Sequence, residues 1–237
     1  MFHDNPLFER LHRATDLAHR RLERRVDTYR PNFDVHGYRR LLQDFWGFYQ
    51  PLERKLDVLA GHNLPSSYSQ RRRKAPRLER DLLALRMTEA DIAALPLCGR
   101  LPAIPTLPQV FGVLYVIDGA ALGERIATTH LHIGGENLAI SPSQGASFFS
   151  SLRASYTPPL DTCWQELIAM TEAVEESNLQ DSIIQSAVDT LECFETWLDH
   201  RRQSHLANSM RNSMRWNSQL EFELFCTERL GEIDKVA

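Results

Sequence analysis

The sequence predicts an all-α fold, in the form of a single-domain bundle of several helices. Glycine supplies only 11 of the 237 residues, about 4.6%, against a typical 7%, and glycine is common in the tight turns that join strands. Apolar residues recur at intervals of three and four, which is the period of an amphipathic helix. No useful stretch alternates with the period of two that is typical of a strand.

Apolar stripes and capping residues place the elements in chain order. One stripe runs from Leu7 to Val26 and predicts a long first helix. Asp34 is a suitable N-cap for a second helix, whose stripe ends at Leu59. A third helix is expected at about 75–86, and a capping box at Thr88–Asp91 predicts a short fourth helix. A second capping box at Thr106–Gln109 begins the helix expected at 107–132. Two further helices are expected at 145–175 and 179–200.

The domain organisation follows from these elements. Residues 1–200 are expected to form one helical domain, because no linker or internal repeat interrupts them. Residues 201–237 are predicted to be a C-terminal extension that is either a last helix or partly disordered.

Composition and charge exclude several classes of protein. The formal net charge of −4 argues against a general binder of nucleic acid. No apolar run approaches the ~18–20 residues that span a bilayer, so no membrane association is expected. The 4 cysteines are scattered along the chain, as small buried hydrophobes of a reducing compartment would be. We therefore expect a cytoplasmic protein.

Three glycines share one predicted helix, although each costs about 0.5–1 kcal/mol relative to alanine. At 100° per residue, Gly112, Gly119 and Gly123 lie within about 20° of one line along that helix. Two interpretations are open. The glycines let another helix approach closely, which the spacing by itself favours, or they expose backbone to a flat ligand.

The first helix carries a candidate metal ligand. Thr15, His19 and Glu23 follow one another at intervals of four, at the edge of the apolar stripe. A half-buried imidazole can ligate a metal while a carboxylate holds its other nitrogen. The alternative is a surface His–Glu pair, which is commoner on spacing alone. His12 and Arg13 on the same helix are either partners for ligand carboxylates or solvated cations.

Together, several segments resemble the bacterial heme oxygenases, which produce biliverdin. These segments are Leu11-His-Arg-Ala-Thr15 with His19 and Glu23, Tyr38-Arg-Arg-Leu-Leu42, Phe48-Tyr-Gln-Pro-Leu-Glu53, Arg73-Lys-Ala-Pro76 with Asp81, Gly112-Val-Leu-Tyr-Val-Ile-Asp-Gly-Ala-Ala-Leu-Gly123, Gly145-Ala-Ser-Phe-Phe149 and Phe194-Glu-Thr-Trp-Leu198. The resemblance covers about residues 7–198, and it is strongest at the glycine-bearing helix.

The resemblance implies a site and a reaction. Heme, as both substrate and cofactor, would lie between the first helix and the glycine-bearing helix, with His19 as ligand to its iron. The implied heme-binding residues are His19, Glu23, Arg13, Tyr115, Gly119 and Gly123. Gly119 and Gly123 would be catalytic as the bare backbone wall on the far side of the heme. Heme, O2 and electrons from an external reductase would give biliverdin, iron and CO, and a phytochrome is a candidate receiver of the biliverdin.

The chain also departs from the family pattern, and this keeps an alternative open. Ala120 stands where animal members have an aspartate, and Glu124 stands where many bacterial members have a small residue. These two positions motivate a second interpretation, in which the protein binds or carries heme without degrading it. A third interpretation is a helical scaffold whose glycines only pack helices.

Overall fold

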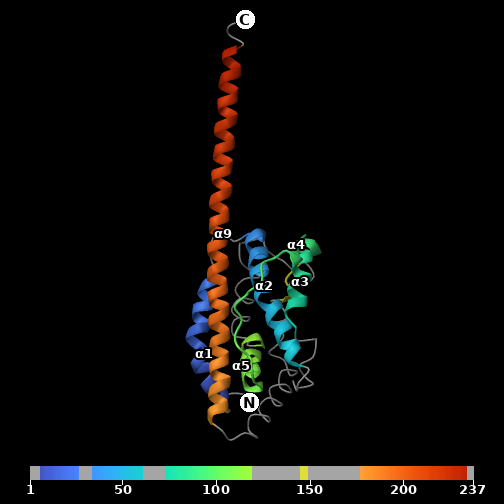
Figure 1. Cartoon of the computed structure of the whole chain (residues 1–237), viewed down its shortest axis with the longest axis vertical. Helices are drawn as coiled ribbons and strands as arrows, with labels where there is room; N and C mark the ends of the chain where they lie inside the picture. The colour runs from blue at the N-terminus through green and yellow to red at the C-terminus, as the bar shows by residue number, and fades with distance from the viewer. Residues whose placement is uncertain (1–5, 27–33, 61–72, 119–144, 149–176, 234–237) are drawn as a thin grey trace. The chain divides into compact units, whose positions relative to one another are not determined.

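The computed structural model describes residues 6–26, 34–60, 73–118, 145–148 and 177–233 (Figure 1). Within these ranges the regular structure is entirely helical, which confirms the predicted all-α class. The helices are α1 (Pro6–Arg25), α2 (Val35–Ala60), α3 (Ala75–Ala84), α4 (Glu89–Ala93), α5 (Leu107–Asp118) and α9 (Ser177–Ile233). None of the helices in the described ranges is long and apolar enough to cross a membrane.

The predicted caps account for where these helices begin. Asp34 Oδ1 accepts the Gly37 N–H at 2.8 Å, so Asp34 caps α2. Both hydrogen bonds of the predicted capping box between Thr88 and Asp91 are present at α4. At α5, the Gln109 side chain accepts the backbone N–H of Thr106 at 3.1 Å. Each of these bonds satisfies an N–H group that the first turn of a helix leaves without a partner.

The last predicted helix is longer than expected, and two other predicted helices are only partly described. The helix expected at 179–200 begins at Ser177 and continues without a break to Ile233, so the C-terminal segment is helical to that point. The expected helices at 107–132 and 145–175 lie outside the described residues after 118 and after 148. The chain divides into two compact units, Met1–Trp197 and Leu198–Ala237.

An aromatic cluster forms the centre of the first unit. Phe48 of α2 stacks on Phe194 of α9 with ring centroids 4.3 Å apart. Phe45 meets Phe194 edge-on at 5.0 Å and Phe148 edge-on at 5.7 Å. All four rings are at most 1% exposed. Aromatic side chains bury large apolar areas, so this cluster joins α2, α9 and the 145–148 segment.

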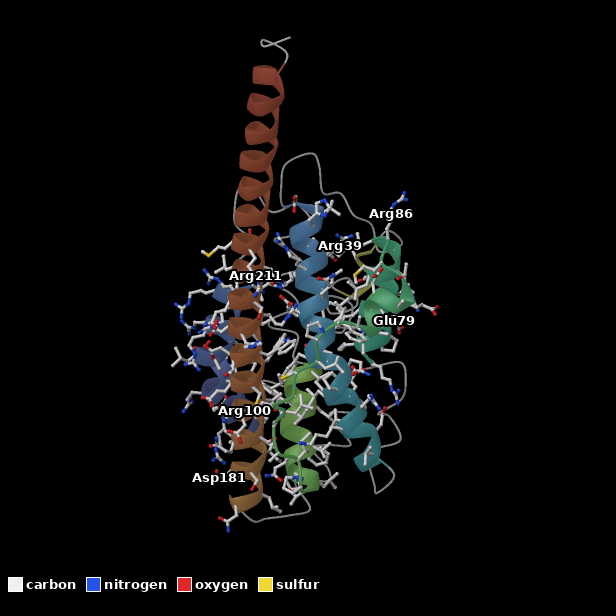
Figure 2. All side chains as sticks on the ribbon, turned by 45° about the horizontal axis from the view of Figure 1, so that its top comes forward. Arg39, Glu79, Arg86, Arg100, Asp181 and Arg211 are labelled. Carbon is white, nitrogen blue, oxygen red and sulfur yellow. The ribbon has the colours of Figure 1, made fainter. Side chains whose placement is uncertain are left out.

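Ion pairs attach α1 to the part of α9 that lies in the first unit. Arg10 donates to Asp181, which is labelled in Figure 2 near the start of α9. Further along both helices, Arg21 Nε lies 3.0 Å from both carboxylate oxygens of Glu195, and Arg25 pairs with the same carboxylate at 2.7 Å. Contacts therefore advance in the same direction along both helices, so α1 and α9 run parallel. Glu195 is only 9% exposed, and its paired charge is stabilised by two guanidinium groups.

Gly112 lets α5 approach α9 closely. A Cβ atom at this position would lie 2.3 Å from the carbonyl oxygen of Ile183 and 2.7 Å from the backbone nitrogen of Ala187. Ser186 Oγ also donates to the Gln109 carbonyl at 2.7 Å, one turn away. For this glycine the packing interpretation is therefore correct. Gly119 and Gly123 lie outside the described residues.

Candidate functional site

His19 lies buried on the inward face of α1, with 8% of its surface exposed. The Thr15 backbone, one turn earlier, acts on the imidazole in the sense that raises its pKa. Nδ1 is the ring nitrogen nearer to the main chain, and a proton held on Nδ1 would leave the lone pair of Nε2 available to a metal.

The surroundings of His19 keep its imidazole neutral. Burial lowers the pKa of His19 below 6.5, because desolvation penalises the charged ring, and this effect outweighs the hydrogen bond to Thr15. The charge of His12 lowers the pKa further, while Asp16 raises it. A neutral imidazole is the form that ligates metal ions. The structure thus presents His19 in the state that ligation requires.

A pocket of about 610 Å³ lies against the same helix. Its lining residues are Phe8, Glu9, His12, Arg13, Asp16 and Arg20 of α1, together with Tyr115 of α5. His19 is not among them, but at 100° per residue it lies about 20° around the helix axis from both Phe8 and His12. Pockets of 300–1,000 Å³ are typical of sites for small ligands and cofactors.

Tyr115 lines the pocket and also contacts Thr15, which lies one turn before His19. It is half-buried, and burial raises the pKa of its phenol while a hydrogen bond to the Thr15 side chain opposes that rise. Thr15 is fully buried, and its Oγ1 donates to the Leu11 carbonyl at 2.8 Å. The ring of Phe8 lies 6.4 Å from that of Tyr115. The two rings give the pocket an apolar wall.

The polar side of the pocket carries two arginines, of which Arg20 forms an ion pair with Asp16 and Arg13 does not. Arg20 donates from Nε to Asp16 Oδ1 at 3.1 Å, and this bond holds the pKa of the Asp16 carboxyl below its usual value. Arg13 is exposed and forms no ion pair with any residue in the described ranges. An exposed guanidinium at a pocket can donate two parallel hydrogen bonds to a ligand carboxylate.

The structure brings together some of the predicted site residues. Arg13 and Tyr115 line one pocket, while His19 is buried about 120° around the axis of α1 from Arg13. Glu23 is half-buried one turn beyond His19, and its pairing with the imidazole stays a prediction. The predicted residues Gly119, Gly123, Ala120 and Glu124 all lie outside the described residues.

Sequence reasoning missed four residues of the pocket, namely Phe8, Glu9, Asp16 and Arg20. Asp16 and Arg20 have the i,i+4 spacing of a helical ion pair, so their contact was visible in the sequence. Their place at a pocket was not, because Tyr115 on the opposite wall is almost a hundred residues away along the chain.

An all-helical domain with a buried, neutral imidazole beside a partly cationic pocket is typical of helical proteins that hold a prosthetic group through histidine. The family model for heme oxygenase matches residues 5–200 of this chain, and the chain therefore belongs to the heme oxygenase family. Searches of curated proteins and of solved structures each find no match.

The described residues fit the heme that this family implies. Among them, no three His, Cys, Asp or Glu side chains gather to hold a bare metal ion. One neutral imidazole, here that of His19, is the single protein ligand that heme iron needs, since the porphyrin supplies the other donors. Phe8 and Tyr115 suit the apolar macrocycle, and Arg13 suits its carboxylates.

Proposed function

We propose that this protein is a heme oxygenase, which binds heme through His19 and converts it to biliverdin, iron and CO. Family membership supports heme as the ligand. The observation that carries the assignment of the ligand is the burial of His19 on α1, which lowers the pKa of the imidazole and so favours the neutral form that ligates metal ions. Bound heme would supply the iron chemistry by which O2 attacks the macrocycle, with electrons from an external reductase.

The protein residues have distinct parts in this proposal. Because its side chain is buried, the His19 ring would have few orientations open to it, and its Nε2 would be the group that holds the heme iron. Arg13 pairs with a propionate, and Tyr115 excludes water from the edge of the macrocycle. Gly119 and Gly123 remain, as proposed from the sequence, the backbone wall on the opposite side. A phytochrome remains a proposed receiver of the biliverdin.

Turnover separates the enzyme from a carrier that leaves heme intact. Full-length protein is titrated with hemin without oxygen and then given a chemical reductant and air. An enzyme should lose the Soret band and gain the broad red absorption of biliverdin, with CO released in equal amount. A protein that retains its Soret band through repeated reduction and reoxidation is a carrier, and the proposal of activity is then wrong. If the protein does not bind hemin at micromolar concentration, it is neither a heme oxygenase nor a heme carrier.

Arg13→Ala should weaken hemin binding without changing the iron ligand. An exposed ion pair contributes about 0.2–1 kcal/mol, so we expect the Kd for hemin to rise by about 1.4- to fivefold. Arg24→Ala is the matched control, because Arg24 is an exposed arginine of the same helix that does not line the pocket. The absorption spectrum of the complex should be the same in both variants. Equal Kd values for the two variants would contradict the role of Arg13.

A further inference from the structure

Two cysteines from distant parts of the sequence lie on segments that both contact α2. Cys98, in the connection between α4 and α5, is a buried free thiol, and Cys193 in α9 is a half-buried one. The backbone N–H of Cys98 donates to the Gly47 carbonyl of α2 at 2.8 Å. Its Sγ lies 3.4 Å from the carbonyl oxygen of Arg100. The connection that carries Cys98 is therefore attached to α2 at Gly47.

Trp197 of α9 contacts the same point of α2. A Cβ atom on Gly47 would lie 2.6 Å from Trp197 Cζ2 and 2.6 Å from the Pro96 carbonyl oxygen. Trp197 Nε1 also donates to the Asp44 carbonyl at 2.7 Å. Cys193 precedes Trp197 by four residues, so the two share one face of α9. The face of α9 that bears Cys193 thus meets the connection that bears Cys98.

Electrostatics agree with this placement. Burial raises the pKa of the Cys193 thiol, and the neighbouring Cys98 raises it further, while Arg100 opposes the rise. Figure 2 shows Arg100 alongside α9. Burial likewise raises the pKa of Cys98. Charge interactions weaken with separation, so the influence of Cys98 on Cys193 agrees with the placement that the contacts at Gly47 give.

We propose that Cys98 and Cys193 are a redox modification site, which a low-molecular-weight disulfide such as oxidised glutathione converts to an intramolecular disulfide. This site is separate from the pocket on α1 and does not depend on heme.

The exposure of the two thiols sets the order of the steps. The Cys193 thiolate, which is the more accessible, attacks one sulfur of the oxidant and releases one glutathione thiolate. Cys98 then loses its proton and attacks the Cys193 sulfur of the mixed disulfide, which releases the second glutathione. Two electrons and two protons pass from the protein to the oxidant. Cys98 needs no contact with solvent, because its only reaction partner is Cys193.

The raised thiol pKa values predict how the rate depends on pH. Only the thiolate attacks, so oxidation should be slow at neutral pH and should accelerate by about tenfold per pH unit until the thiol pKa is reached. The disulfide would tie the connection between α4 and α5 to α9 beside Trp197. Closing so long a loop restricts the unfolded chain, and we expect the midpoint of thermal unfolding to rise by several degrees.

The test uses the full chain with Cys163→Ser and Cys226→Ser, so that only the two proposed thiols remain. This protein is treated with oxidised glutathione, and peptides are mapped by mass spectrometry with and without a reductant. We expect a linked peptide pair that joins Cys98 to Cys193, with the loss of two hydrogen atoms and no retained glutathione. A disulfide requires Cα atoms within about 7 Å, so the linked pair also tests the proximity.

Single variants supply the controls. Cys98→Ser should stop at a stable mixed disulfide on Cys193, and Cys193→Ser should leave Cys98 unmodified. The proposal would be overturned if the protein with only Cys163→Ser and Cys226→Ser retained glutathione on Cys193 after complete reaction and gave no peptide pair that joins Cys98 to Cys193. Modification of Cys98 in the Cys193→Ser variant would overturn the order of steps. If a variant does not fold, mapping of the wild-type protein still decides whether the link forms.

Discussion

His19→Ala is expected to remove the axial imidazole from the hemin complex and to abolish turnover. Loss of a group that only orients a metal ligand costs about 10–100-fold, so loss of the ligand itself should lower the rate of biliverdin formation by more than about 100-fold. The Soret band should shift to that of heme without a protein nitrogen ligand. Absorption and electron paramagnetic resonance spectra of the ferric complex would measure the change directly.

His12→Ala is the matched control for this prediction. His12 lies two turns before His19 on the same face of α1, but it is exposed where His19 is buried. We expect the axial-imidazole spectrum to persist in this variant. Added imidazole should restore the spectrum of the His19→Ala complex by entering the space of the lost ring. If His19→Ala retains the wild-type spectrum, His19 is not the ligand and the proposed site is wrong.

Gly112→Ala is expected to destabilise the fold, because its Cβ would meet backbone more closely than a Cβ at Gly47, Gly99 or Gly145 would. The new Cβ would meet backbone atoms of Ile183 and Ala187 at 2.3 and 2.7 Å, and backbone cannot move aside as a flexible side chain can. Overpacking of a core costs about 1–3 kcal/mol and occasionally more, which exceeds the 0.5–1 kcal/mol that alanine gains over glycine in a helix. We expect a net loss of about 2 kcal/mol, or a fall of roughly 4–8 °C in Tm.

Gly99→Ala tests whether this loss comes from the close approach of α5 to α9. A Cβ atom on Gly99 would have no heavy atom within 4 Å, so we expect its Tm to lie within about 1 °C of the wild-type value, in line with a neutral surface change. Both variants should be compared without ligand, by thermal unfolding monitored with circular dichroism. Equal stability of the two variants would show that α9 adjusts around the methyl group, and the role of Gly112 in packing would be wrong.

The parts of the fold that the sequence predicted are those that depend on capping residues and on the period of apolar residues within a helix. Asp34 and the Thr88–Asp91 box begin helices as predicted, because a capping bond joins residues only three apart and needs no knowledge of the rest of the chain. The buried face of α1 followed in the same way from its apolar period, which placed His19 at the edge of that face. The sequence could not indicate that the C-terminal helix continues to Ile233, because its polar residues suit either a helix or a disordered segment.

By itself the sequence determined the helical class and the beginnings of the helices, since these depend on neighbours within one or two turns. The choice of His19 came from the family resemblance, because spacing alone favoured a surface His–Glu pair. Only the tertiary structure decided that His19 is buried and what Gly112 contacts. The His19 side chain is 8% exposed, and Gly112 meets the backbone of α9 at Ile183 and Ala187. The pocket likewise requires Tyr115 from α5 opposite Arg13 from α1. The physical reason is that such contacts join segments many residues apart, and their distances are set by how whole helices pack rather than by the residues beside them.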